Sequence, residues 1–342
     1  MSKKKLDYLG VSAFAESMAM MIKAGVSTEE AILLLQQDNN HGLLADALDL
    51  MAKETSEGKT FYEAMYDTGI FPDYALEMVK AGEKTGKLEK VMSSLADYYQ
   101  NEKEISDKLK TAVVYPASMI VMIIVVLLIM LFMVLPVFTD VYDKLTASSF
   151  RYISFAYTIC RVLLIIMVAI FLLVVICYAM WKAGKKKTVE KFLRIIPGVS
   201  AILDEMGTFR FTNAYAIYLS SGMYPNESLQ QSMQLVDCEP VEKILEKCAE
   251  DMEEGHGFAY AANKEGLYEP IYAKMLVPAE RSGNTDEALN RLIDLLKADI
   301  NTMVSNLVNT VEPLLSGILM ISIGLVLVSL MLPLIGMMNS IG

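Results

Sequence analysis

Residues 111–138, TAVVYPASMIVMIIVVLLIMLFMVLPVF, form a long apolar stretch without a charged side chain between Lys110 and Asp140. An unpaired backbone amide in hydrocarbon is very costly, so an apolar run of this length satisfies its own hydrogen bonds by forming a helix. Long apolar runs also cover residues 162–181 and 312–338. The pattern predicts three transmembrane helices.

The polar stretches beside these runs have a helical pattern of their own. Apolar residues recur three and four positions apart, as at Phe14, Met18, Met21 and Ile22, which places them on one face of a helix. Residues 8–110 contain no alternating β-branched run of the kind that marks a half-buried strand. The hydrophobic pattern therefore predicts an all-α, polytopic membrane protein.

The chain repeats itself at an offset of 197 residues. Pro116 and Pro136, near the two ends of the first apolar run, recur as Pro313 and Pro333. Further back, the offset pairs Phe14 with Phe211, Gly25 with Gly222, Glu30 with Glu227, Gly58 with Gly255, Glu83 with Glu280, and Gly86 with Gly283. A repeat without gaps indicates a duplicated unit. We expect residues 8–110 and 208–307 to be two copies of one helical bundle, each leading into a transmembrane helix.

The repeated glycines and acidic residues lie at predicted helix corners. In the first copy a helix ends at Gly25, Ser27 or Thr28 caps the next helix, and Glu30 lies in its first turn. The positions that carry the repeated motifs are Gly25, Glu30, Gly58, Glu83, Gly86, Pro116, Gly222, Glu227, Gly255, Glu280, Gly283 and Pro313. Glu83 and Glu280 are either local caps or contacts for a partner, and their presence in both copies favours the structural role.

Residues 82–87, GEKTGK, superficially match a phosphate-binding loop. A true loop has four residues between its first glycine and the Gly-Lys pair, a Ser or Thr after the lysine, and a preceding strand. Here the spacing is three, Leu88 follows Lys87, and helical patterns flank the segment. The second copy, AERSGN, lacks the lysine altogether. We therefore expect a helix corner here and no nucleotide site.

Charge and cysteine content exclude further classes of function. The net charge is −11, and the acidic excess lies in the two polar halves, which argues against a nucleic-acid partner and against reading the first corner as a DNA-binding helix-turn-helix. The four cysteines are scattered, no CxxC occurs, and the two histidines are isolated from any ligand pattern. No paired-carboxylate or nucleophile pattern is present. We expect no metal, no cofactor and no catalytic activity.

Basic residues predict the topology. Lys182, Lys185, Lys186 and Lys187 directly follow Trp181, so positive charge places the chain after the second run in the cytoplasm. The N-terminus, MSKKKLDYLG, has no apolar core of a signal peptide, and we expect the first transmembrane helix to direct insertion. The predicted regions are a cytoplasmic bundle (1–110), a transmembrane helix (111–138), an extracytoplasmic loop (139–161), a second transmembrane helix (162–181), a second cytoplasmic bundle (182–311), a third transmembrane helix (312–338) and an extracytoplasmic tail (339–342).

Four stretches together resemble the type II secretion system F family: MIKAGVSTEEAI, FPDYALEMVKAGEKTGKLEKVMSSLADYY, VVYP, and the terminal EPLLSGILMISIGLVLVSLMLPLIGMM. The resemblance covers nearly the whole chain. One departure is Ala279, which stands in the second copy where the Gly-Glu-x-x-Gly pattern has its first glycine. Alanine is small enough for the same corner.

The resemblance implies two tandem six-helix cytoplasmic bundles and a non-enzymatic platform in the inner membrane. Such a platform couples a cytoplasmic assembly ATPase to the insertion or extraction of pilins or pseudopilins, in a type IV pilus, type II secretion or competence machine, and it works beside other inner-membrane components as a homo-oligomer. The alternative is a small membrane transporter subunit. Transporters carry ionisable or helix-breaking residues near the bilayer midplane, and the first and third runs show no such charge there. Which machine the protein serves stays open.

Overall fold

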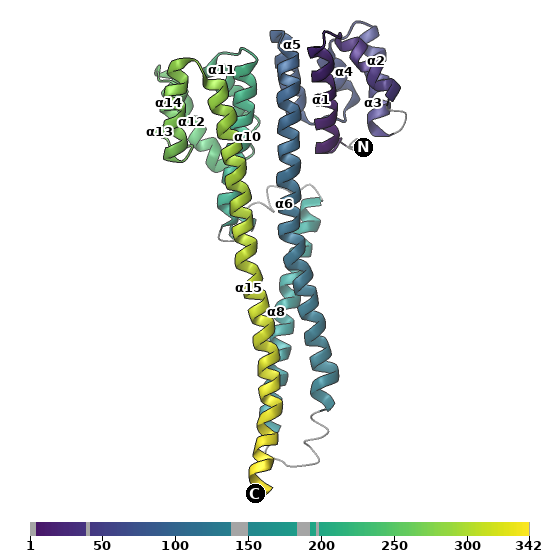
Figure 1. The fold of residues 1–342 in the computed structure, drawn as a ribbon, viewed down its shortest axis with the longest axis vertical. Coiled ribbons are helices and arrows are strands. Elements are labelled where there is room, and N and C mark those ends of the chain that lie inside the picture. Colours follow the sequence, from purple (N-terminus) through teal and green to yellow (C-terminus); the bar gives the residue numbers. More distant parts are fainter. Residues whose placement is uncertain (1–4, 39–41, 138–149, 183–191, 196–197, 342) are drawn as a thin grey trace. The chain divides into compact units, whose positions relative to one another are not determined.

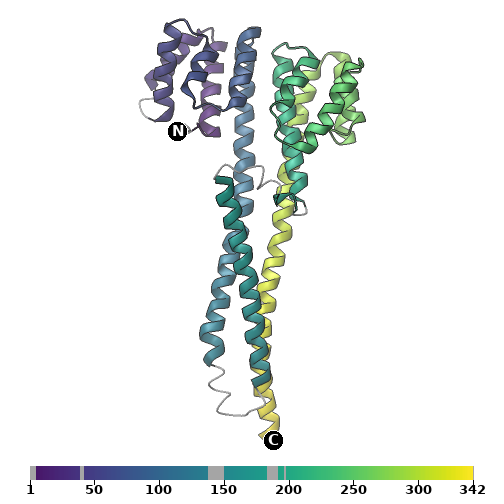
Figure 2. The same ribbon diagram turned by 180° about the vertical axis from the view of Figure 1, so that it is seen from behind.

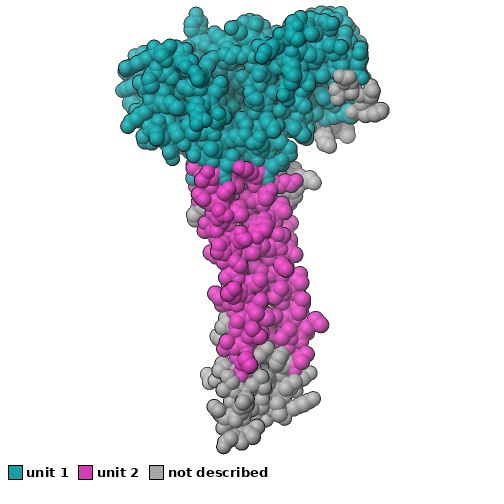
Figure 3. All heavy atoms as spheres, viewed as in Figure 1, with its two compact units in different colours: residues 1–107, 201–301 teal, residues 108–200, 302–342 magenta. Residues whose placement is uncertain are grey.

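The computed structural model describes residues 5–38, 42–137, 150–182, 192–195 and 198–341. Within these residues the secondary structure is helical throughout, without a strand. Figure 3 colours the two compact units into which the chain divides. Residues 1–107 and 201–301 belong to unit 1, and residues 108–200 and 302–342 belong to unit 2.

Unit 1 contains two copies of one helix order (Figure 1). The first copy consists of α1 (Tyr8–Lys23), α2 (Thr28–Asp38), α3 (Leu43–Ser56), α4 (Phe61–Thr68), α5 (Asp73–Thr85) and the start of α6 (Leu88–Ile129). The second consists of α10 (Val199–Ser220), α11 (Pro225–Met233), α12 (Glu239–Glu253), α13 (Phe258–Lys264), α14 (Pro270–Ser282) and the start of α15 (Thr285–Ile341). Four of the six pairs begin 197 residues apart, so the offset in sequence is an offset in structure.

Local chemistry explains where these helices begin and end. Thr60 and Glu63 form a capping box at the start of α4, and Ser27 Oγ accepts a hydrogen bond from the Glu30 amide at 3.2 Å at the start of α2. Helices α5 and α14 both end at a left-handed glycine, Gly86 with φ 69° and Gly283 with φ 74°. A side chain is disfavoured in this backbone conformation, which is why the corner requires glycine in both copies.

The two hydrophobic cores are built from equivalent aromatic residues. In the first copy Phe14 lies 6.4 Å from Phe61 and 5.0 Å from Phe71, measured between ring centroids. In the second, Phe211 and Phe258, the counterparts of Phe14 and Phe61, lie 6.1 Å apart. All five rings are at most 2 % exposed. Burying side chains of this size is a major source of stability in a small bundle.

Unit 2 is formed by three long apolar helices: the rest of α6, α8 (Phe150–Lys182) and the rest of α15. Both ribbon views show them side by side (Figures 1 and 2). They meet in an apolar contact that includes Leu127, Met167 and Val326. Outward-facing side chains such as Met122 and Met320 are 66 % and 76 % exposed. Each helix is long and apolar enough to cross a membrane.

Pro116, near the start of the first apolar run, lies inside α6, because a long apolar helix tolerates one lost hydrogen bond. A five-residue π-helical segment, η1 (Met130–Val134), precedes Pro136 near the other end of this run. The structure differs from the sequence expectation at the start of the second apolar helix. Helix α8 begins at Phe150, inside the expected loop of residues 139–161, so it includes Arg161 and the residues before it. Residues 139–149 and the lysines at 185–187 lie outside the described residues.

Candidate functional site at the contacts between the copies

Glu83 and Glu280 are held against the start of a neighbouring helix. The carboxylate oxygens of Glu83 accept hydrogen bonds from the backbone amides of Phe61 and Tyr62, at 2.8 and 2.9 Å, in the first turn of α4. Glu280 Oε2 accepts one from the Ala259 amide of α13 at 3.2 Å. First-turn amides have no partner within their own helix and carry partial positive charge. Both glutamates therefore act as caps supplied by another helix.

The predicted glycines lie at the corners that the sequence indicated. Gly25, Gly58, Gly86, Gly222, Gly255 and Gly283 all have positive φ, and the space around each would accommodate a Cβ atom. Backbone conformation, and not crowding, is therefore what selects glycine. Glu30 and Glu227 lie exposed in the first turns of α2 and α11, where a negative charge is favoured.

Pro116 and Pro313 mark a direct contact between equivalent helices in unit 2. The residues just before them, Tyr115 and Glu312, are themselves separated by 197 residues, and Tyr115 Oη donates a hydrogen bond to Glu312 Oε1 at 2.9 Å. Helices α6 and α15 therefore contact each other here at equivalent residues of the two copies. Glu312 brings a carboxylate to the start of the third apolar run.

An ion pair between a half-buried arginine and a buried carboxylate joins the two copies in unit 1. Arg210 on α10 donates from Nε to Glu102 Oε1 at 2.9 Å and from Nη2 to Glu102 Oε2 at 3.0 Å. Although burial alone would lower it, Glu102 raises the pKa of Arg210. The Glu102 side chain is only 4 % exposed, so the arginine neutralises a charge that water cannot reach. Repeat comparison does not find this pair, because the counterpart of Arg210 is Ala13.

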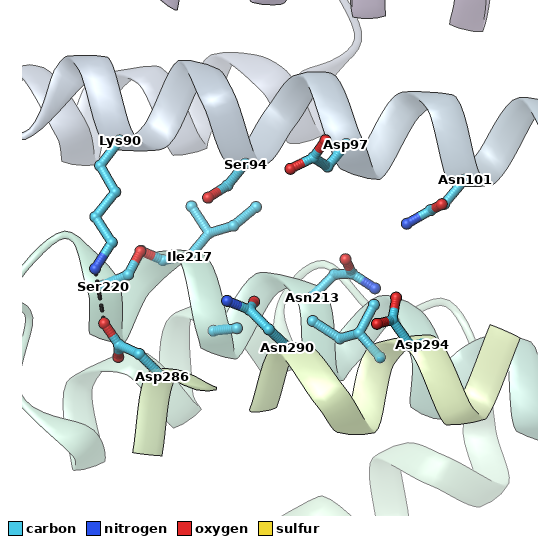
Figure 4. Close-up of a pocket in the computed structure, with 12 residues that line it drawn as sticks. Lys90, Ser94, Asp97, Asn101, Asn213, Ile217, Ser220, Asp286, Asn290 and Asp294 are labelled. Carbon is cyan, nitrogen blue, oxygen red and sulfur yellow. Dashed lines mark hydrogen bonds and ion pairs between the residues drawn. The ribbon is translucent and has the colours of Figure 1, made fainter. Parts of the chain in front are cut away.

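A polar cavity of about 480 Å³ lies between α6, α10 and α15 in unit 1 (Figure 4). At one end Lys90 Nζ lies 2.7 Å from Asp286 Oδ2. Two equivalent carboxylates, Asp97 and Asp294, line the same cavity. Burial, followed by the nearby charges of Glu16 and Asp294, raises the pKa of Asp97. The two copies therefore meet through this polar cavity as well as through the buried Glu102 carboxylate.

The structure gives the GEKTGK segment a structural role. It forms the corner between α5 and α6, where the Lys87 amide donates to the Gly82 carbonyl at 2.8 Å. A Cβ atom on Gly82 would lie 2.8 Å from Val91, so this glycine permits close helix packing. Among the described residues, no group of three or more His, Cys, Asp or Glu side chains is arranged to hold a metal ion.

The two copies also coincide with two matches to one family model. The model of type II secretion system (T2SS) protein F matches residues 14–136 and again residues 211–333. The chain belongs to the type II secretion system protein F family. The resemblance drawn from its motifs is thereby confirmed, as is the prediction of an all-helical membrane protein with two tandem copies.

Relatives of this chain have names that refer to pilus assembly and secretion. The type IV pilus assembly protein PilC of Thermus thermophilus is 22 % identical over 89 % of this chain and 77 % of its own length. The type II secretion system protein F of Vibrio cholerae is 21 % identical over 85 % of this chain and 73 % of its own. The HofC homolog of Escherichia coli, a protein transport protein, is 24 % identical over 87 % and 76 %. The family and the three apolar helices make this chain a multi-pass membrane protein.

Proposed function

We propose that this protein is the inner-membrane assembly platform of a type IV pilus or type II secretion machine. In this proposal a cytoplasmic assembly ATPase acts on the two bundles of unit 1, and the transmembrane helices pass its motion to pilins or pseudopilins in the membrane. The names of the relatives support a role in pilus assembly or secretion. The long helices that join the bundles to the apolar runs support the proposed transmission of motion.

The observation that carries the coupling is the continuity of α6 and α15. Helix α6 runs from Leu88 in the first bundle to Ile129 in the first apolar run, and α15 runs from Thr285 in the second bundle to Ile341. A helix resists bending because each residue is tied by backbone hydrogen bonds. A displacement of a bundle is therefore transmitted to the membrane along a continuous helix.

Helix-breaking substitution tests this coupling. Leu109 lies in α6 between the first bundle and the apolar run, so Leu109→Pro should abolish pilus or pseudopilus assembly while leaving ATPase capture by the purified protein intact. Leu109→Ala, which keeps the helix, is the matched control and should assemble normally. Normal assembly by the proline variant would exclude transmission through α6.

We further propose that the chain performs no chemistry itself. The purified protein should neither bind nor hydrolyse ATP, because the corner at Gly86 offers no phosphate cradle. ATP hydrolysis that disappears in Lys87→Ala would overturn this part of the proposal. A transporter remains the alternative, and it is favoured if reconstituted vesicles leak a solute only when the protein is present.

A further inference from the structure

Two large apolar side chains lie exposed in the segment between α8 and α10. Phe192 and Ile195 belong to one turn, in which the Ile195 amide donates a hydrogen bond to the Phe192 carbonyl at 3.2 Å. Their exposed fractions are 58 % and 75 %. Residues three positions apart in such a turn lie on the same side of it. The two residues, called the apolar pair below, therefore form one exposed apolar surface.

The duplicated bundle does not account for the apolar pair. Helix α10 begins at Val199, six residues before the position that corresponds to Tyr8 at the start of α1. The pair precedes even this extension, so it lies outside the helices that the two copies share. Its exposure therefore calls for an explanation other than the packing of the repeated bundle.

A contact with α15 gives the height of the apolar pair relative to the apolar runs. A Cβ atom built on Gly198 would lie 3.6 Å from Leu307 Cδ1, and both residues belong to unit 2 or its border with α10. Leu307 precedes Glu312, where the third apolar run begins, by five residues, or about 7.5 Å along a helix. Ile195 is three residues from Gly198, which is a span of at most about 10 Å.

This height matches the surface of a bilayer. The polar headgroup region is about 5–7 Å thick on each side of the hydrocarbon. Leu307 lies at about that distance outside the third apolar run, and the apolar pair is within reach of the same level. Because the helices of unit 2 are long and apolar enough to cross a membrane, lipid headgroups surround them at this height.

The sequence around the apolar pair has the charge of a membrane-surface segment. From Lys182 to Ile195 there are six basic residues and one acidic residue, a net charge of +5 in a chain whose net charge is −11. Arg194 lies between the two members of the pair. Aromatic and aliphatic side chains among lysines and arginines are typical of segments that lie on an anionic lipid surface.

We infer that Phe192 and Ile195 insert into the headgroup region of the leaflet that faces the bundles and anchor this segment to anionic lipid. Helix α10 begins four residues after Ile195, so the anchor ties the start of the second bundle to the membrane. The second bundle then has two attachments, this anchor and α15. The inference depends on the membrane-crossing helices and not on the pilus or secretion role.

Tryptophan fluorescence of the full-length protein in lipid vesicles tests the anchor. The chain has a single tryptophan, Trp181, so Trp181→Phe provides a background without tryptophan for either Phe192→Trp or Ile195→Trp. In vesicles of phosphatidylcholine and phosphatidylglycerol, lipid brominated near the headgroup end of its acyl chains should quench both probes. Acrylamide in the water should quench them at least about threefold less than an exposed control.

The control is Tyr224→Trp in the same background, because Tyr224 is 79 % exposed at the start of α11 in unit 1. Acrylamide should quench this probe strongly, and brominated lipid should not. If acrylamide quenches Phe192→Trp as strongly as the control, the pair lies in water and the inference is overturned. A probe that neither quencher reaches would be covered by protein, from the same chain or another, which would also overturn it.

Vesicle composition tests the choice of an anionic surface. Quenching of Phe192→Trp by brominated lipid should be weaker in vesicles of phosphatidylcholine alone, and high salt should weaken it in the mixed vesicles, because the basic residues then lose their attraction to the surface. Equal quenching under all these conditions would overturn the role of anionic lipid.

Discussion

Buried carboxylates occur at equivalent positions of the two copies, but their partners differ. Glu54 pairs with Lys59 at 2.9 Å, while its counterpart Asp251 pairs with Lys264. In each carboxylate, one buried oxygen accepts no hydrogen bond from the described residues. Removing the lysine partner of such a buried carboxylate would therefore cost considerable stability. Both copies therefore have a buried carboxylate at this position, but the lysine that pairs with it comes from a different position in each copy.

The start of α4 depends on the side chain of Glu83. Glu83→Ala leaves the amides of Phe61 and Tyr62 without acceptors, which should cost about 1–3 kcal/mol. Hydrogen exchange should accelerate at these two amides more than elsewhere in the first bundle. Lys84→Ala, on the same helix and exposed, is the control. Unchanged exchange in Glu83→Ala would show that the carboxylate does not cap α4.

Glu205 should make the second bundle sensitive to pH. Burial, then the charges of Asp299, Glu269 and Asp204, raises the pKa of Glu205 from 4.5 to about 7. The folded protein then binds a proton that the unfolded chain releases above pH 4.5, so this contribution to stability is lost as pH rises through 7.

Glu205→Gln should remove that dependence. As pH rises from 5 to 8, the wild type should lose about 2–3 kcal/mol of stability relative to the variant. The apparent Tm values of the two proteins should therefore be similar at pH 5, and the wild type should have the lower Tm at pH 8. Glu227→Gln, exposed on α11, should follow the wild type at both values. A constant difference between wild type and Glu205→Gln would contradict the raised pKa.

At the scale of elements, repeat comparison predicted more than hydrophobicity alone. The offset anticipated the helix order of the second copy and the corners at Gly86 and Gly283, because a left-handed backbone restricts the choice of residue. It did not predict the Arg210 contact, because a contact between copies need not be symmetric and Ala13 breaks the match. Helix α8 starts before its apolar run because a helix can extend beyond the membrane, where hydropathy carries no signal.

The ion pair between α6 and α10 should be strongly context-dependent. Arg210→Met leaves Glu102 buried and unpaired, which should cost about 3–5 kcal/mol. Arg210→Met combined with Glu102→Leu should recover most of this loss, since no charge then remains buried. Thermal unfolding of the two single variants and the double variant measures the coupling. Additive losses in the double variant would show that the two side chains do not interact.

For the whole molecule, the lysines after Trp181 and the three apolar helices predict that both bundles are cytoplasmic and that the C-terminus is outside. Single cysteines placed in a background without the four native ones test this in intact cells. A membrane-impermeant maleimide should label Ser340→Cys and should leave Ser56→Cys and Ser282→Cys unlabelled. The last two positions are exposed on the bundles, so they should react once the membrane is permeabilised, which separates sidedness from burial. Labelling of Ser56→Cys in intact cells would reverse the orientation and place both bundles where no cytoplasmic ATPase could reach them.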